Sequence, residues 1–127
     1  MFTSKSLTST QRRLVWGVRI VLALAFFAAG SAKLAGAAQM VDVFEAIGAG
    51  QWFRYVTGAV ETVAAVLLLV PATGFLGGLI TLVTMTAAVG THVFVIGGSF
   101  LPALVLALLS AFVVWQLRPL SLPALTR

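Results

Sequence analysis

The sequence predicts an all-α membrane protein: a four-helix transmembrane bundle with antiparallel up-down topology and a short interfacial helix between the first and second spans. Two observations lead to this prediction. Of the 127 residues, 61% are hydrophobic and only 9% are charged, whereas a soluble domain carries about 25% charged residues. The mean hydropathy is +1.11. The surface of a soluble domain cannot be solvated by so few charges. We therefore expect residues 1–127 to form a single membrane domain in contact with a lipid bilayer.

The first expected span covers residues 14–34, an apolar run that only Arg19 interrupts before Lys33. At 1.5 Å per residue this run reaches roughly 30 Å, the thickness of a bilayer core. The alternative is a cleaved signal peptide, with small residues at 30–32 as its cleavage site. Arg19 inside the apolar region opposes that alternative, so we expect a retained helix.

Residues 38–48 are too few to span and mix apolar with acidic side chains. Met40, Phe44 and Ile47 recur at helical spacing, with Asp42 and Glu45 between them. This pattern predicts a short amphipathic helix at the membrane interface, ended by the glycines at 48 and 50. The following residues 51–55 (QWFRY) have the mixture of aromatic and cationic side chains typical of headgroup depth.

Three further spans are expected at about 53–70, 75–96 and 100–117. The connections between them, at 71–74 and 97–99, are rich in Pro and Gly and carry no charge. Because both connections are short, consecutive helices must pack as antiparallel neighbours.

Basic residues predict the orientation. Lys5, Arg12 and Arg13 precede the first span, and Arg118 and Arg127 follow the last. By the positive-inside rule both termini are expected in the cytoplasm, as an even number of spans requires.

Composition also limits the chemistry. The chain has no cysteine and one histidine, which removes disulfides, thiol redox pairs and iron–sulfur ligation, and we expect no metal site. The net charge of +5 comes from scattered residues that match no nucleic-acid-binding motif, so we expect no nucleic-acid partner. Redox chemistry would need a bound diffusible cofactor or a partner protein.

Ionisable residues within membrane spans are costly and are candidates for function. Arg19, Gly30 and Lys33 fall on one face of the first helix, and Gly58 and Glu61 share a small-residue face of the second. Counted from the outer boundary, Lys33, Glu61 and His92 all lie in the outer half of the bilayer. We therefore expect an outer-leaflet polar pocket formed by the first three helices. Its expected ligand-binding residues are Lys33, Trp52, Arg54, Tyr55, Glu61 and His92.

Structural roles compete with each of these assignments. Glu61 is equally well explained as an ion-pair partner of Lys33 or Arg54 that fixes helix register. His92 is more often a hydrogen-bonded bundle residue, and Lys33 more often an interfacial anchor. Arg19 is expected to snorkel or to pin the cytoplasmic end. The spacing of these residues identifies no catalytic group, and whether the protein is an enzyme stays open.

Three stretches resemble the DoxX family in its DoxX-like branch. They are Arg19 followed by 25–34 (AFFAAGSAKL), 58–61 (GAVE) leading into 67–71 (LLLVP), and 87–92 (AAVGTH). The resemblance covers nearly the whole chain and implies a multi-pass four-helix bundle in a bacterial inner membrane. Some relatives are subunits of a thiosulfate:quinone oxidoreductase, and others are associated with thiol-redox or oxidative-stress complexes. Because this chain lacks cysteine, direct thiol exchange cannot be carried over to it.

Most relatives have no assigned activity. A carboxylate within the spans and a histidine at similar depth lead to the hypothesis of a quinone-linked or redox-associated membrane subunit. A quinone is then the candidate cofactor and a redox protein a candidate partner. In this hypothesis Glu61 and His92 exchange protons with the ligand. The alternative is a non-enzymatic scaffold or binding subunit that stabilises partner proteins, and a homo-oligomer is compatible with either hypothesis. A small transporter is less favoured, because four short spans leave little room for alternating access.

Overall fold

The computed structural model describes residues 3, 4 and 6–121, and confirms the all-α prediction. The helices are α1 (Ser9–Ala35), α2 (Ala38–Ile47), α3 (Gln51–Leu69), α4 (Gly74–Thr91) and α5 (Leu101–Leu117). A 3-10 turn, η1 (Pro71–Thr73), precedes α4, and a π-helical turn, η2 (His92–Ile96), continues it. The strands β1 (Thr3–Ser4) and β2 (Pro119–Ser121) pair antiparallel and join the two ends of the described chain.

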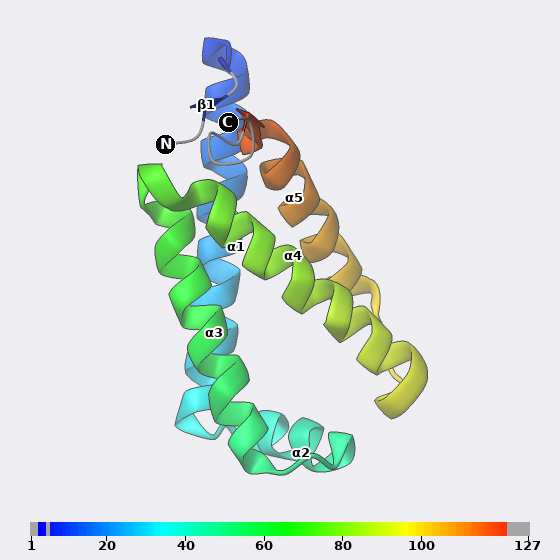
Figure 1. Ribbon diagram of the computed structural model, residues 1–127. Helices are drawn as coiled ribbons and strands as arrows, with labels where there is room; N and C mark the ends of the chain where they lie inside the picture. The colour runs from blue at the N-terminus through cyan, green and yellow to red at the C-terminus, as the bar shows by residue number, and fades with distance from the viewer. Residues whose placement is uncertain (1–2, 5, 122–127) are drawn as a thin grey trace.

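The long helices form two antiparallel pairs. In Figure 1, α3 runs back along α1 and α5 runs back along α4, while α4 slants away from α3 toward its carboxyl end. The short helix α2 crosses the far ends of α1 and α3. We call this the α2 end of the molecule; the terminal end is the opposite one, where β1 and β2 meet.

Within the described residues, three helical segments are long and apolar enough to cross a membrane. They are Ser9–Ala35, Gln51–Leu69 and Pro71–Ile96, while Leu101–Leu117 is apolar but shorter. Their outward faces carry large apolar side chains, among them Leu24, Val63, Val83 and Leu108. Such faces suit lipid contact, so the chain is a membrane protein with several membrane-spanning helices.

The buried core lies where the two helix pairs meet. Leu22 and Phe26 of α1 pack with Leu68 of α3, Met85 of α4 and Val113 of α5. A hydroxyl pair crosses the α4–α5 contact, where Thr81 donates to Ser110 at 2.8 Å. Both hydroxyls are fully buried, and the bond satisfies groups that would be costly to leave unpaired in an apolar interior.

Helix boundaries differ most from expectation at the start of α1. We expected the apolar run to begin at residue 14, but α1 begins at Ser9. Thr8 and Gln11 form a capping box, in which each side chain bonds the other's backbone N–H. This capping box begins the helix more than a turn before the apolar run. Lys5 and Arg127, two residues used for the orientation, lie outside the described residues.

Candidate functional site

A buried ion pair joins α1 to α3 near the α2 end. Lys33 Nζ lies 3.0 Å from Glu61 Oε2, and the two side chains are 12% and 2% exposed. The helices meet closely beside it: a Cβ added to Gly30 would lie 2.6 Å from Thr62 Oγ1 and 2.9 Å from the Gly58 carbonyl oxygen. Glycine at both 30 and 58 therefore lets the two backbones approach and brings Lys33 within reach of Glu61.

This pair leaves hydrogen-bonding groups to spare. An ammonium group has three N–H donors and a carboxylate has two acceptor oxygens. One donor of Lys33 and only Oε2 of Glu61 are used. Among the described residues neither side chain makes a further polar contact. Neither side chain has a fully buried nitrogen or oxygen without a hydrogen-bond partner, so the unused atoms are accessible. The pair thus keeps an acceptor and two donors for another polar group.

Arg54 supports the pair from the first turn of α3. Its Nη1 donates to the Lys33 carbonyl oxygen, and its Nε donates to Gln51 Oε1 at 2.7 Å. The guanidinium carbon also lies 4.3 Å from the centroid of the Tyr55 ring. Arg54 therefore ties the end of α1 to the start of α3, and it contacts Lys33 through the backbone rather than pairing with Glu61.

The two predicted aromatic residues lie at the surface of the same region. Trp52 is 62% exposed and Tyr55 is 51% exposed. The Trp52 indole N–H donates to the Ala49 carbonyl oxygen at 2.9 Å. That bond fixes the indole and leaves its faces available for contact with lipid or ligand.

His92 begins the π-helical turn at the end of α4. Its Nδ1 lies 2.9 Å from the Gly97 carbonyl oxygen. Because a carbonyl only accepts, Nδ1 must carry the proton and Nε2 is then the acceptor of the neutral ring. Gly97 has φ 70° and ψ −158°, a backbone conformation essentially restricted to glycine. The structure thus groups Lys33, Glu61, Arg54 and Tyr55, and it gives His92 a separate partner.

Arg19 lies at the terminal end and is buried, with 3% exposure. Its Nε donates to the Leu68 carbonyl oxygen at 2.6 Å and its Nη2 to that of Val70 at 2.7 Å. Its guanidinium carbon lies 3.8 Å from the Trp16 ring centroid. Both carbonyls lie at the end of α3, where helical carbonyls run out of helical N–H partners; that of Val70 also accepts from the Thr73 N–H at 3.1 Å. Arg19 therefore pins this end of the bundle rather than snorkelling to solvent.

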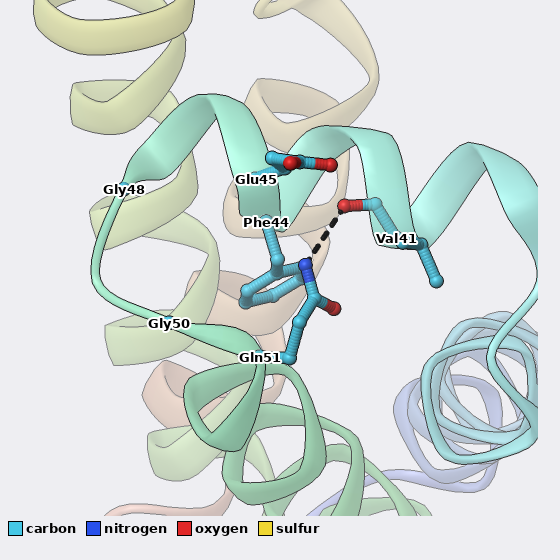
Figure 2. A pocket seen from close by; sticks show the side chains of 6 residues that line it. All are labelled: Val41, Phe44, Glu45, Gly48, Gly50 and Gln51. Atoms are coloured by element: carbon cyan, nitrogen blue, oxygen red, sulfur yellow. Dashed lines mark hydrogen bonds between the residues drawn. The ribbon is translucent and has the colours of Figure 1, made fainter.

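A pocket of about 360 Å³ lies between α2 and the first turn of α3. Its lining residues are Val41, Phe44, Glu45, Gly48, Gly50 and Gln51. Figure 2 shows the Phe44 and Gln51 side chains between α2 and the start of α3. Sequence reasoning missed this pocket, although it had placed an amphipathic helix and two glycines there.

Comparison with known proteins identifies the family. The model of the DoxX-like family matches residues 17–115, which span the candidate residues described above. The chain therefore belongs to the DoxX-like family, as its motifs indicated. Searches of curated proteins and of solved structures gave no match.

Proposed function

We propose that this DoxX-like protein is a quinone-linked or redox-associated membrane subunit that binds a small lipophilic ligand at the Lys33–Glu61 pair. The observation that carries the proposal is the incomplete use of this pair. It lies in the apolar part of the chain, yet one carboxylate oxygen and two ammonium donors have no partner among the described residues. Within a bilayer such groups gain from a polar ligand more than they would in water.

A quinone fits this set of groups. Its carbonyl oxygens accept hydrogen bonds, which the spare donors of Lys33 supply. Its reduced form carries hydroxyls, which can donate hydrogen bonds to the Glu61 carboxylate. The bound quinone would supply the electron-transfer chemistry. Lys33 is the more exposed partner, so the ligand would first meet the ammonium group, with Glu61 behind it as the group that holds or releases a proton.

The surrounding residues have supporting roles in this proposal. Arg54 holds the Lys33 backbone in place, and Tyr55 and Trp52 offer exposed ring faces on which a planar headgroup can stack. His92 offers Nε2 as a second proton acceptor, since Nδ1 is engaged by Gly97. Among the described residues His92 makes no hydrogen bond or ion pair with Lys33 or Glu61, so the ligand itself would connect His92 to the pair.

We further propose a four-span topology in a bacterial inner membrane, with both termini cytoplasmic. At 17 residues, α5 covers roughly 25 Å at 1.5 Å per residue, enough for a slightly thinned bilayer. Its antiparallel packing on α4 returns the chain to the terminal end. Arg12, Arg13 and Arg118 then lie together at the cytoplasmic face. In this orientation α2 lies at the outer interface, where a redox partner or a second copy of the chain could dock.

A scaffold role is the second candidate, and a specific observation favours it. Among the described residues, no fully buried side-chain nitrogen or oxygen lacks a hydrogen-bond partner. A bundle whose buried polar groups are internally paired needs no ligand to be stable. In that case the Lys33–Glu61 pair only specifies the register of α1 against α3.

Quinone binding to the purified protein separates these two functions. A short-chain ubiquinone is titrated into the protein in detergent, and quenching of tryptophan fluorescence reports binding. We expect Lys33→Met to weaken the affinity for ubiquinone about tenfold, as loss of one charge-assisted hydrogen bond predicts. When the titration is repeated with the reduced form, ubiquinol, we expect Glu61→Gln to weaken the affinity by a similar factor, because the carboxylate accepts from the quinol hydroxyls. Glu45→Gln is the matched control, since Glu45 lies outside the pair, and it should bind like the wild type.

Circular dichroism of each variant checks that its helix content equals that of the wild type. Equal affinity of the wild type and Glu61→Gln for ubiquinol, together with equal affinity of the wild type and Lys33→Met for ubiquinone, would refute the ligand site. If Glu61→Gln also lowered the melting temperature sharply, the scaffold role would be the better account.

A further inference from the structure

We propose that the pocket between α2 and α3 is a second binding site, which holds the ammonium-bearing headgroup of a membrane phospholipid. The proposal is independent of the function proposed for the Lys33–Glu61 pair. It rests on the lining of the pocket, on the charge that this lining presents, and on its place at the end of the apolar helices.

The shape of the pocket suits a headgroup with its nearby methylene groups. Phe44 is buried and packs edge-on against Phe53, with ring centroids 5.7 Å apart. Together with Val41 it forms an apolar wall. The pocket is open to the surface, and its volume of about 360 Å³ leaves room for a headgroup that stays partly exposed.

Glu45 is the only charged side chain in the lining. It is exposed, and it makes no ion pair or hydrogen bond to any other described residue. Gln51 is the other polar side chain, but both ends of its amide are engaged. Its Nε2 donates to the Val41 carbonyl oxygen at 3.1 Å (Figure 2), and its Oε1 accepts from Arg54. Glu45 is therefore the side chain available for ionic contact with a ligand.

The backbone adds little net charge to the pocket. Gly48 ends α2 and Gly50 begins α3, and both glycines line the pocket. A helix carboxyl end favours cations and a helix amino end favours anions by similar amounts, so the two effects largely offset one another. The Glu45 carboxylate then decides the preference, and it favours a cation. A primary ammonium group both neutralises the carboxylate and donates hydrogen bonds to it.

The position of the pocket favours a lipid over a soluble amine. The helix α2 crosses the ends of the apolar helices α1 and α3 (Figure 1). The neighbouring Trp52 and Tyr55 are exposed aromatic residues of the kind that lie at headgroup depth. A phospholipid in the adjacent leaflet would place its ammonium group at Glu45, its first methylene groups against Phe44, and its chains along the bundle.

Native mass spectrometry with added lipids tests this assignment. The delipidated full-length protein receives phosphatidylethanolamine, which carries an ammonium group, or phosphatidylglycerol, which does not. We expect a saturable phosphatidylethanolamine adduct that Glu45→Gln reduces about fivefold, the effect of losing one exposed charge pair. The matched control is Asp42→Asn, an identical charge change on an exposed residue of α2 outside the pocket lining. It should bind like the wild type, and Glu45→Asp should retain part of the binding.

Several outcomes would overturn the proposal. Equal adducts with both lipids, or equal losses in Glu45→Gln and Asp42→Asn, would show that the pocket does not recognise the ammonium group. Soluble ethanolamine provides a further arm. If ethanolamine displaces the lipid at millimolar concentration, the site recognises the ammonium group alone, and the assignment to a phospholipid is wrong. If ethanolamine does not displace the lipid, the assignment to a phospholipid stands. Glu61→Gln should leave this adduct unchanged, which separates this site from the Lys33–Glu61 pair.

Discussion

The two ends of the bundle handle a charged group among apolar helices in different ways. At the terminal end Arg19 donates two hydrogen bonds to the carbonyls that close α3, and it stacks on Trp16. At the α2 end Lys33 and Glu61 make a single bond to one another. Arg19 is thus bonded to the backbone and covered by an indole ring, and it can offer donors only. The Lys33–Glu61 pair retains an acceptor as well as donors for another group.

This contrast suggests how a small membrane bundle can be held rigidly at one end and keep a ligand-binding site at the other. A polar group in hydrocarbon must be satisfied, and a guanidinium bonded to the backbone and covered by a ring has no acceptor to offer a ligand. A pair of side chains with unused hydrogen-bond donors and an unused acceptor can bind a ligand. The difference predicts that changes at the terminal end mainly affect folding, while changes at the α2 end mainly affect binding.

The largest effect is expected from Arg19→Met. The substitution removes both bonds to the end of α3 and leaves the carbonyls of Leu68 and Val70 without this partner. We expect a loss of about 3 kcal/mol in the free energy of unfolding, because bonds from charged donors contribute about 1.5–3 kcal/mol each and the buried cation's own cost is relieved. Unfolding followed by circular dichroism in detergent measures this loss. Arg19→Lys should recover part of it, and an unchanged stability would contradict the structural role.

The next effect tests the space around Arg19. A Cβ on Gly74 would lie 2.5 Å from Arg19 Cζ and 2.8 Å from Leu117 Cδ1, so Gly74→Ala must displace one of them. Overpacking of this kind costs about 2 kcal/mol. Gly90→Ala, in the same helix with nothing within 4 Å, should instead stabilise by about 0.5 kcal/mol. The same unfolding measurement compares the two variants. Equal stabilities would mean that α4 does not pack against Arg19 as described.

A smaller effect than that of Arg19→Met or Gly74→Ala is expected at the Lys33–Glu61 pair. A double-mutant cycle with Lys33→Met, Glu61→Gln and both together should give a coupling free energy of about 1 kcal/mol. This value should lie below the loss in Arg19→Met. A coupling that exceeded the Arg19 loss would reverse the comparison and favour the scaffold function.

Much of this fold follows from patterns in the sequence. Apolar runs, glycines and prolines located the helices to within a few residues, except at Ser9, where the capping box begins α1 early. The spacing of Lys33 and Glu61 on small-residue faces made their pairing one of the open alternatives, and the structure pairs them.

Other features have no such signal. The partners of Arg19 are backbone carbonyls, which every residue has, so no side-chain pattern identifies them. The π-helical turn η2, which begins at His92, depends on how the chain leaves the helix at Gly97. The pocket under α2 depends on how closely that helix packs on the start of α3, which its amphipathic pattern does not determine.

Native mass spectrometry of the protein extracted gently from its own membranes tests the central claim most directly. We expect the wild type to retain a bound mass that matches a quinone, and Glu61→Gln, at equal helix content, to lose it while Glu45→Gln keeps it. A ligand-free wild type accompanied by a stoichiometric partner protein would contradict the ligand site. That result would show instead that the Lys33–Glu61 pair serves the assembly of a larger complex.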